Sequence, residues 1–348
     1  MQESRSRTFV SKTEYEFSAD EIESKLSEFA SMGITELSVH DGILANDRGR
    51  ILRMMRLIQK NCPDLLFTIR VEASAFDRDV CRQASEMNCT IDMPFHPVSN
   101  DGKTCLLDKK MYAGRAGMMN DTGLVFGFIM DYASVPGDSF KLFRDRLDFA
   151  VSLYPNHIDF PETENVEKML NSADIPVQTV KPTALFAAQD IRYARDISFA
   201  CRTFYSAGRA VPWFLPVLQP LKISASSFFS DFAEWQHGSN CNYRSGFIPE
   251  QVNHKEIEKM QLLFLGTKYD EKGKSELMPV VRDIVMLNGA FSRLTGENEE
   301  SVVTTAYNPD DLLGPESSDI LSFAENVCME ESKVKIFYTP DGPDYKII

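Results

Sequence analysis

The segment 123–160 constrains the fold of this chain most, because it has the pattern of a strand, a polar loop, a helix and a second strand. Leu124–Met130 is a nearly continuous apolar run, as expected of a parallel strand that is buried on both faces. Pro136 and Gly137 interrupt this run, and Asp138 stands where it can cap the next helix. The segment therefore predicts a β-α-β unit, which belongs to a parallel sheet.

The helix of this unit carries one apolar stripe. Its apolar side chains recur at helical spacing: Phe140, Phe143, Leu147 and Ala150. We expect this stripe to face the sheet. Pro155 ends the helix just before the second strand, which begins at His157.

The same alternation of strand and helix precedes this unit. A capping box at Ser18–Glu21 begins the first helix, and Gly33 can end that helix in a left-handed conformation. We predict further strands at 36–39, 65–71 and 90–93, and helices at about 48–60, 79–87 and 109–116. Alternation of this kind predicts right-handed crossovers and a parallel α/β sheet, either open or closed into a barrel.

Polar residues stand at or just after the carboxyl ends of these strands: Asp41, Glu72, His96 and Asp131. Active sites of parallel sheets are built at this edge. We therefore expect the functional site there.

The pattern changes after Phe160. Helices are expected at 187–205 and 224–236, with an aromatic turn between them, and His237–Glu250 has the composition of a linker. The remaining residues predict a small α+β appendage. The expected domains are a β/α unit at 1–165, a helical segment at 166–245 and an α+β domain at 246–348.

Composition excludes several classes of partner. The chain has 348 residues, of which 43% are hydrophobic, enough for two or three domains. Its net charge of −14 argues against nucleic acid or an anionic membrane surface as the main partner. No apolar run reaches the roughly 18 residues of a membrane helix, and the first residues contain no apolar signal core. We expect a cytoplasmic protein.

The 7 cysteines are scattered and form no CxxC pair. This pattern argues against a disulfide framework and against a structural zinc site. We expect most of these thiols to be buried as small apolar groups.

Two runs resemble a known family: FGFIMDYASVPGDSFKLFRDRLDFAVSLYPNHIDF at 126–160 and FYSAGRAVPWFLPVLQPL at 204–221. Both are similar to the cobalamin-associated branch of the radical S-adenosylmethionine enzymes. EIESKLSEFASMGITELSVHDGILAND at 21–47 also fits the first helix and second strand of that family. The resemblance implies a partial TIM-type barrel, with S-adenosylmethionine, a [4Fe–4S] cluster and cobalamin as cofactors.

The chain departs from this family in several ways. The family holds its cluster with a CxxxCxxC motif after the first barrel strand, but no cysteine precedes Ser18. The cobalamin-binding domain that normally precedes the barrel is not matched. Ala133 stands where the family has glycine, and PETENVEK at 161–168 replaces a loop similar to LPGT. The chain is therefore either a piece of a larger or split enzyme, or a degenerate paralogue without the cluster.

The resemblance implies roles for particular residues, although it identifies no catalytic residue. Four residues would contact S-adenosylmethionine: Asp41, Arg70, Glu72 and Asp131. Arg209 and His96 would contact a small-molecule or peptide substrate. The structural alternatives are an ordinary ion pair between Arg70 and Glu72, and an Arg209 that only packs its segment onto the barrel.

We expect a protein that binds S-adenosylmethionine or substrate for a radical methyl-transfer or rearrangement reaction. A partner or an upstream polypeptide would supply the cluster and the cobalamin. One alternative is an inactive pseudo-enzyme that acts as a scaffold or partner protein.

The histidines open a second alternative, a metal-dependent barrel hydrolase. Five residues near strand ends could bind a divalent metal ion: His40, Asp41, His96, His157 and Asp159. No HxH or HExxH pair supports this reading. His157 also begins its strand, which predicts that it lies on the rim opposite to the other histidines. We therefore assign no metal site from the sequence.

Overall fold

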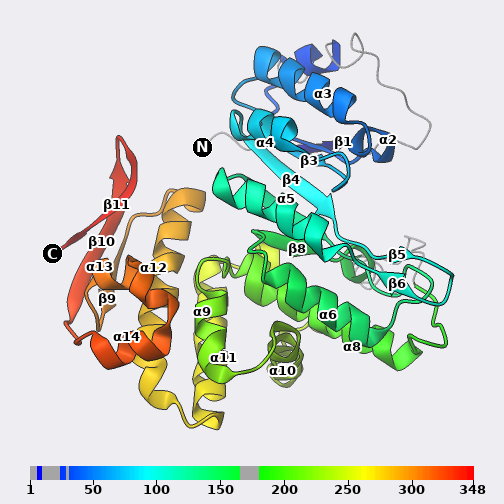
Figure 1. The fold of residues 1–348 in the computed structure, drawn as a ribbon. Coiled ribbons are helices and arrows are strands. Elements are labelled where there is room, and N and C mark those ends of the chain that lie inside the picture. The colour runs from blue at the N-terminus through cyan, green and yellow to red at the C-terminus, as the bar shows by residue number, and fades with distance from the viewer. Residues whose placement is uncertain (1–5, 10–23, 29–30, 165–179) are drawn as a thin grey trace. The chain divides into compact units, whose positions relative to one another are not determined.

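The computed structural model describes residues 6–9, 24–28, 31–164 and 180–348. The chain divides into two compact units (Figure 1). The first comprises Met1–Asp138 and Phe149–Pro161, and the second comprises Ser139–Asp148 and Glu162–Ile348. Each unit is treated by itself below. The capping box expected at 18–21 lies outside the described residues.

The first unit is built on a parallel sheet. Its strands, in spatial order, are β1 (Ser6–Phe9), β2 (Glu36–Val39), β3 (Leu66–Arg70), β4 (Cys89–Pro94), β7 (Val125–Ile129) and β8 (His157–Asp159). Every neighbouring pair is parallel. The predicted parallel α/β sheet is confirmed, and β1 is a strand that the sequence did not predict.

The sheet is open within the described residues. β1 and β8 are its edge strands, and no pairing joins them in the ranges that the structure describes. A closed TIM-type barrel is therefore not shown, and the partial barrel stays a prediction.

The helices of the first unit connect successive strands (Figure 1). They are α2 (Gly42–Ala45), α3 (Arg48–Asn61), α4 (Arg78–Ser85) and α5 (Lys109–Asp121); α6 (Phe140–Val151) spans the division between the units. Aspartate side chains at Asp47, Asp77 and Asp108 accept hydrogen bonds from amides in the first turns of α3, α4 and α5. A short hairpin of β5 (Val98–Ser99) and β6 (Cys105–Leu106) follows β4.

The order of the strands determines which face the helices cover. The spatial order follows the chain order, so right-handed crossovers place the connecting helices on one face of the sheet. That face is apolar and buried: Leu37, Val39, Phe67, Ile69, Ile91, Met93, Phe126, Phe128 and Ile158. The other face carries polar side chains: Ser38, His40, Thr68, Arg70, Thr90, Asp92, His157 and Asp159.

β7 follows this division, and one expectation for it was wrong. Phe126 and Phe128 are buried on the apolar face, but Val125 on the other face is 45% exposed. β7 is therefore not buried on both faces, because its second face lies on the polar side of the sheet.

Two polar side chains stand at the start of α6, and the cap expected at Asp138 stays a prediction. Ser139 immediately precedes the helix, and its Oγ accepts a hydrogen bond from the Leu142 amide at 3.3 Å. The Asp138 carboxylate accepts one from the Ala133 amide at 3.0 Å, within the loop. The predicted apolar stripe is confirmed at Phe143 and Leu147, which are fully buried.

The second unit is mostly helical. Its long helices are α8 (Ala188–Cys201), α10 (Ala225–Gly238), α11 (His254–Glu271) and α12 (Met278–Glu297), and α8 continues into a π-helical turn, Arg202–Ala207. Shorter helices are α9 (Phe214–Leu218), α13 (Pro309–Leu313) and α14 (Ile320–Asn326). An antiparallel sheet of β9 (Ser301–Thr305), β10 (Ser332–Thr339) and β11 (Gly342–Ile347) completes it. None of the helices that the structure describes has the length and apolar character of a bilayer span.

The segment expected as a linker contains structure of its own. Two 3₁₀ turns, Tyr243–Ser245 and Pro249–Gln251, lead from α10 to α11. Tyr243 is buried, and its hydroxyl donates a hydrogen bond to Asp196 on α8 at 2.9 Å. The segment therefore packs inside the second unit.

The two-faced sheet makes a prediction about stability. Phe128→Ala should lower the free energy of unfolding by about 3–5 kcal/mol, because Phe128 packs against Phe95, Tyr112 and Phe126 in the core. Val125→Ala, on the same strand but facing the polar side, should cost less than about 1 kcal/mol. Urea unfolding followed by circular dichroism measures both. Equal losses would contradict the assignment of the two faces.

Candidate functional site on the polar face of the sheet

The strand register aligns polar residues across the sheet. Arg70 pairs with Asp92, Asp92 with Gly127, and Gly127 with His157. Residues that pair directly share a face of the sheet. His40 belongs to the same row, because it follows Val39, the partner of Ile69. We call these five residues the polar row.

Asp92 is the centre of the polar row. It is 5% exposed, and its Oδ1 lies 3.0 Å from Nε2 of His157. Its Oδ2 lies 3.5 Å from Nε2 of His40. His157 Nε2 is also 3.6 Å from Oδ2 of Asp159. Each imidazole thus reaches over one intervening strand to Asp92, and we call His40, Asp92, His157 and Asp159 the His–Asp cluster.

Gly127 makes the reach of His157 sterically feasible. A Cβ at position 127 would lie 2.0 Å from Nε2 of His157 and 2.2 Å from its Cδ2. The imidazole therefore occupies the space that any other residue would fill with its side chain.

The electrostatics of the His–Asp cluster follow from this packing. Burial opposes the ionisation of Asp92, but the imidazoles of His157 and His40 outweigh it and lower the pKa of Asp92 to about 2. Burial likewise disfavours the charged form of His157, but its hydrogen bond to Asp92 and the charge of Asp159 outweigh burial and raise its pKa. Asp92 is therefore a carboxylate at neutral pH.

Arg70, Glu72 and Asp131 lie toward the carboxyl ends of their strands. Burial alternates beyond Arg70 and Ile129, with Val71 and Met130 buried and with Glu72 and Asp131 partly exposed. Alternation places Glu72 and Asp131 on the polar face with Arg70. Arg70 and Glu72 form no ion pair with one another among the described residues. Within those residues, the buried Nε of Arg70 has no hydrogen-bond partner.

Asp41 has a structural role. Its Oδ1 accepts hydrogen bonds from the amides of Ile43 and Leu44 at 2.8 and 3.0 Å, which caps α2. Its Oδ2 is buried without a hydrogen-bond partner in the described part of the chain. A contact of Asp41 with a cofactor stays a prediction.

The two residues expected to bind substrate lie in different units. His96 is exposed in the first unit, just after β4. Arg209 belongs to the second unit, where it donates to the carbonyl of Ser292 at 3.0 Å and pairs with Glu297. These contacts hold Arg209 against α12, and its role toward a substrate stays a prediction.

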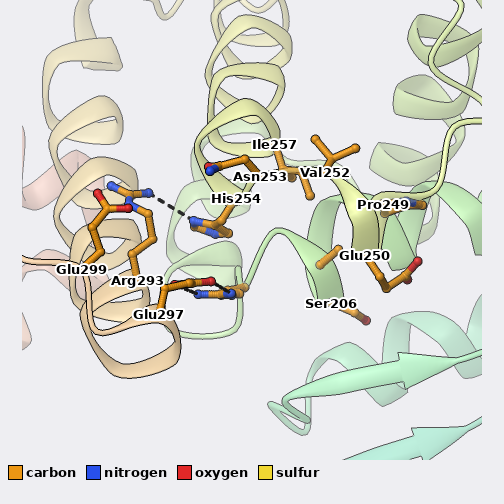
Figure 2. Close-up of a pocket in the computed structure, with 12 residues that line it drawn as sticks. Ser206, Pro249, Glu250, Val252, Asn253, His254, Ile257, Arg293, Glu297 and Glu299 are labelled. Carbon is orange, nitrogen blue, oxygen red and sulfur yellow. Dashed lines mark hydrogen bonds and ion pairs between the residues drawn. The ribbon is translucent and has the colours of Figure 1, made fainter. Parts of the chain in front are cut away.

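Arg209 also lines a pocket of about 370 Å³ in the second unit. Figure 2 shows His254 and Arg293 pointing toward one another in it, with 3.1 Å between His254 Nδ1 and an arginine nitrogen. Arg293 also donates to Glu258 at 2.6 Å. Burial and the charge of Arg209 lower the pKa of His254 to about 4, so this imidazole is neutral at pH 7. The charged side chains of the pocket are thus held in ion pairs, Arg209 with Glu297 inside the lining, and Glu250, Glu299 and Arg293 with residues outside it.

The structure corrects one expectation and adds one residue. The sequence placed His157 on the opposite rim, but the register puts it in one row with Asp92 and Arg70. Position along a strand does not determine register, which depends on the partner strand. The sequence analysis missed Asp92. Its signal was a single acid inside the otherwise apolar strand β4.

The thiols agree with the expectation from sequence. All seven cysteines are described and none forms a disulfide. Among the described residues, one group of three clustered side chains could bind a metal ion: Asp92, His157 and Asp159. The ligand atoms of these three residues lie within 4.8 Å of one another. No three cysteines gather there.

Comparison with known proteins gives only distant likenesses. No protein-family model and no curated protein matches the chain. The radical S-adenosylmethionine methyltransferase TsrM from Kitasatospora setae, with tryptophan and an S-adenosylmethionine analogue bound, aligns at 15% identity and a TM-score of 0.32. That alignment covers 40% of this chain and 29% of TsrM.

A second likeness is to the carboxyl transferase domain of Rhizobium etli pyruvate carboxylase with 3-bromopyruvate. It has 8% identity and a TM-score of 0.31, and covers 99% of this chain and 75% of that one. TM-scores this low carry no argument about fold or function, so the function rests on the residues themselves.

His254 predicts how the second unit responds to acid. Because its folded pKa of about 4 is below the ordinary value of 6.5, the unfolded chain binds the proton more tightly. The contribution of neutral His254 to the stability of the folded state is therefore fully present above pH 6.5 and is lost as the pH falls toward 4. Between pH 7 and pH 5 we expect a loss of about 2 kcal/mol from this group.

Both tryptophans, Trp213 and Trp235, lie in the second unit, so tryptophan fluorescence during urea unfolding measures this loss there. His254→Gln should reduce the dependence on pH, whereas His96→Gln, at an exposed site, should leave it unchanged. The lowered pKa of Glu250 does not involve His254 and contributes equally in all three proteins, whereas the lowered pKa of Glu297 owes part of its shift to His254 and belongs to the same effect. An unchanged slope in His254→Gln would refute the assignment.

Proposed function

We propose that the polar face of the parallel sheet binds S-adenosylmethionine, and that the chain serves a radical methyl-transfer or rearrangement reaction with a partner or upstream polypeptide. Two sequence runs, at 126–160 and 204–221, support the family assignment. The observation that carries the binding site is the buried Nε of Arg70, which has no hydrogen-bond partner in the part of the chain that the structure describes, on a face that also holds Glu72 and Asp131.

The charges on this face fit the ligand. S-adenosylmethionine carries a carboxylate, an ammonium group and a sulfonium. A guanidinium binds a carboxylate with paired hydrogen bonds, and such a bond would satisfy the Nε of Arg70. The carboxylates of Glu72 and Asp131 would accept hydrogen bonds from the ammonium group and offset the sulfonium charge.

The chain's own residues do not fit the [4Fe–4S] cluster. A cluster of this kind is held by cysteine thiolates, but no three cysteines gather among the described residues. We therefore derive no step through a cluster or through cobalamin. In the proposed reaction both groups belong to the partner polypeptide.

The rival is a pseudo-enzyme that supports its partner only as a scaffold. The two roles differ in whether the polar face must keep its charges. A scaffold would tolerate neutral substitutions of Arg70 and Glu72, because neither side chain is in the apolar core. A binding site would not tolerate them. Asp41 is a poor position for this test, because its substitution would remove the cap of α2.

Calorimetric titration of the purified chain with S-adenosylmethionine tests the proposal. We expect saturable binding that Arg70→Met weakens at least tenfold, because the ligand carboxylate loses a bidentate partner. Arg53→Met is the matched control, since Arg53 is exposed on α3, and should bind as the wild type does. No binding by the wild type, alone or with the partner polypeptide, would remove the cofactor role and leave the scaffold.

A further inference from the structure

We propose that the His–Asp cluster is a binding site for one divalent transition-metal ion of the Zn²⁺ type. Its ligands would be His40, Asp92, His157 and Asp159, which come from three separate places in the chain: the end of β2, the middle of β4 and β8. This site goes beyond the proposed binding of S-adenosylmethionine and does not depend on it.

The distances between the donor atoms match a metal site. Zinc bonds to nitrogen and oxygen are about 2.0–2.2 Å, so the ligand atoms of a tetrahedral site lie about 3.4 Å apart. The cluster shows 3.0 Å from His157 Nε2 to Asp92 Oδ1 and 3.6 Å from His157 Nε2 to Asp159 Oδ2. His40 Nε2 is 3.5 Å from Asp92 Oδ2. The ligand atoms of Asp92, His157 and Asp159 all lie within 4.8 Å of one another, so small side-chain adjustments would bring these three groups onto one ion. His40 lies outside this group of three, and a larger rotation of its ring toward Asp92 would add it as the fourth ligand.

Burial of the donors also favours a metal over a set of hydrogen bonds. Nε2 of His40 is buried and makes no hydrogen bond within the described residues, although it points to Asp92. A hydrogen-bonded His157–Asp92 pair leaves this nitrogen unsatisfied, which costs free energy. A cation between the groups would satisfy both imidazoles and both carboxylates at once.

The chemistry of the donor set selects the class of ion. Imidazole nitrogen suits zinc, iron, nickel and copper, whereas calcium and magnesium prefer sites made only of oxygen. Two carboxylates and two neutral imidazoles carry a net charge of −2, which a divalent ion neutralises. Asp159 has the most exposed side chain of the four, at 37%, so it is the ligand that water or a substrate could displace.

Gly127 is part of the site. It lies between Asp92 and His157 in the polar row, and only its lack of a side chain lets the imidazole lie over β7. The proposed set differs from the ligands considered from sequence, because Asp92 enters and the exposed His96 has no part in it.

The experiment is a titration of the purified full chain, freed of metal with a chelator, with Co²⁺ and then with competing Zn²⁺. Absorption of bound Co²⁺ measures the stoichiometry and the affinity. We expect one equivalent per chain, an affinity at least tenfold lower in His157→Gln and Asp92→Asn, and displacement by Zn²⁺. His96→Gln is the matched control and should bind as the wild type does.

If substitution of the buried Asp92 prevents folding, the variants Gly127→Ala and Asp159→Asn test the metal site instead. The added methyl group can push the His157 ring aside without moving backbone, because the crowded atoms belong to that ring. Circular dichroism should therefore report a folded protein that binds Co²⁺ at least tenfold more weakly. Asp159 is partly exposed, so its variant should also fold and should bind more weakly.

Two results would overturn the proposal. One is less than a tenth of an equivalent of bound metal in the wild type. The other is wild-type affinity in the folded Gly127→Ala and Asp159→Asn proteins. Calorimetry with S-adenosylmethionine on the metal-free wild type separates the two proposals. Binding of S-adenosylmethionine and binding of metal are then measured independently, so absence of one does not affect the test of the other.

Discussion

The first unit depends on the division of its sheet into two faces with opposite chemistry. In β2, β3, β4 and β8 apolar and polar side chains largely alternate, and the parallel register brings like side chains into rows across neighbouring strands. Because strand order follows chain order, the connecting helices of the first unit, α3, α4 and α5, cover the apolar rows. The core is therefore complete on one side, and the polar rows are left for chemistry.

The polar row concentrates that chemistry around one buried carboxylate. Burial of Asp92 would be unfavourable alone, and the imidazoles of His157 and His40 compensate for it. The approach of His157 needs Gly127, which leaves space above its strand. Arg70 shares the row, and its buried Nε has no hydrogen-bond partner among the described residues. The proposed site for a charged small molecule and the proposed site for a cation thus share one face of the sheet, toward the carboxyl ends of the strands.

Much of the fold was predictable, because local sequence patterns determine where its strands and helices begin and end. Apolar runs in the strands and proline or glycine at the breaks predicted five strands of the first unit's sheet and the helices between them to within a few residues, but not β1, α2 or the β5–β6 hairpin. The candidate site was only partly predictable. Glu72 and Asp131 follow strand ends, a position that sequence reveals. Asp92 lies inside a strand, and no neighbouring residue in the sequence indicates that two histidines approach it in the folded protein.

The sequence by itself determined the alternation of strands and helices, the parallel sheet, the absence of a cysteine pattern for a cluster and the polar residues at strand ends. Only the tertiary structure decided which polar residues meet. His40, Asp92 and His157 are separated by long stretches of chain, and their meeting depends on strand register. Register depends on the packing of whole strands and helices against one another, so it is a property of the assembled sheet and not of any one segment.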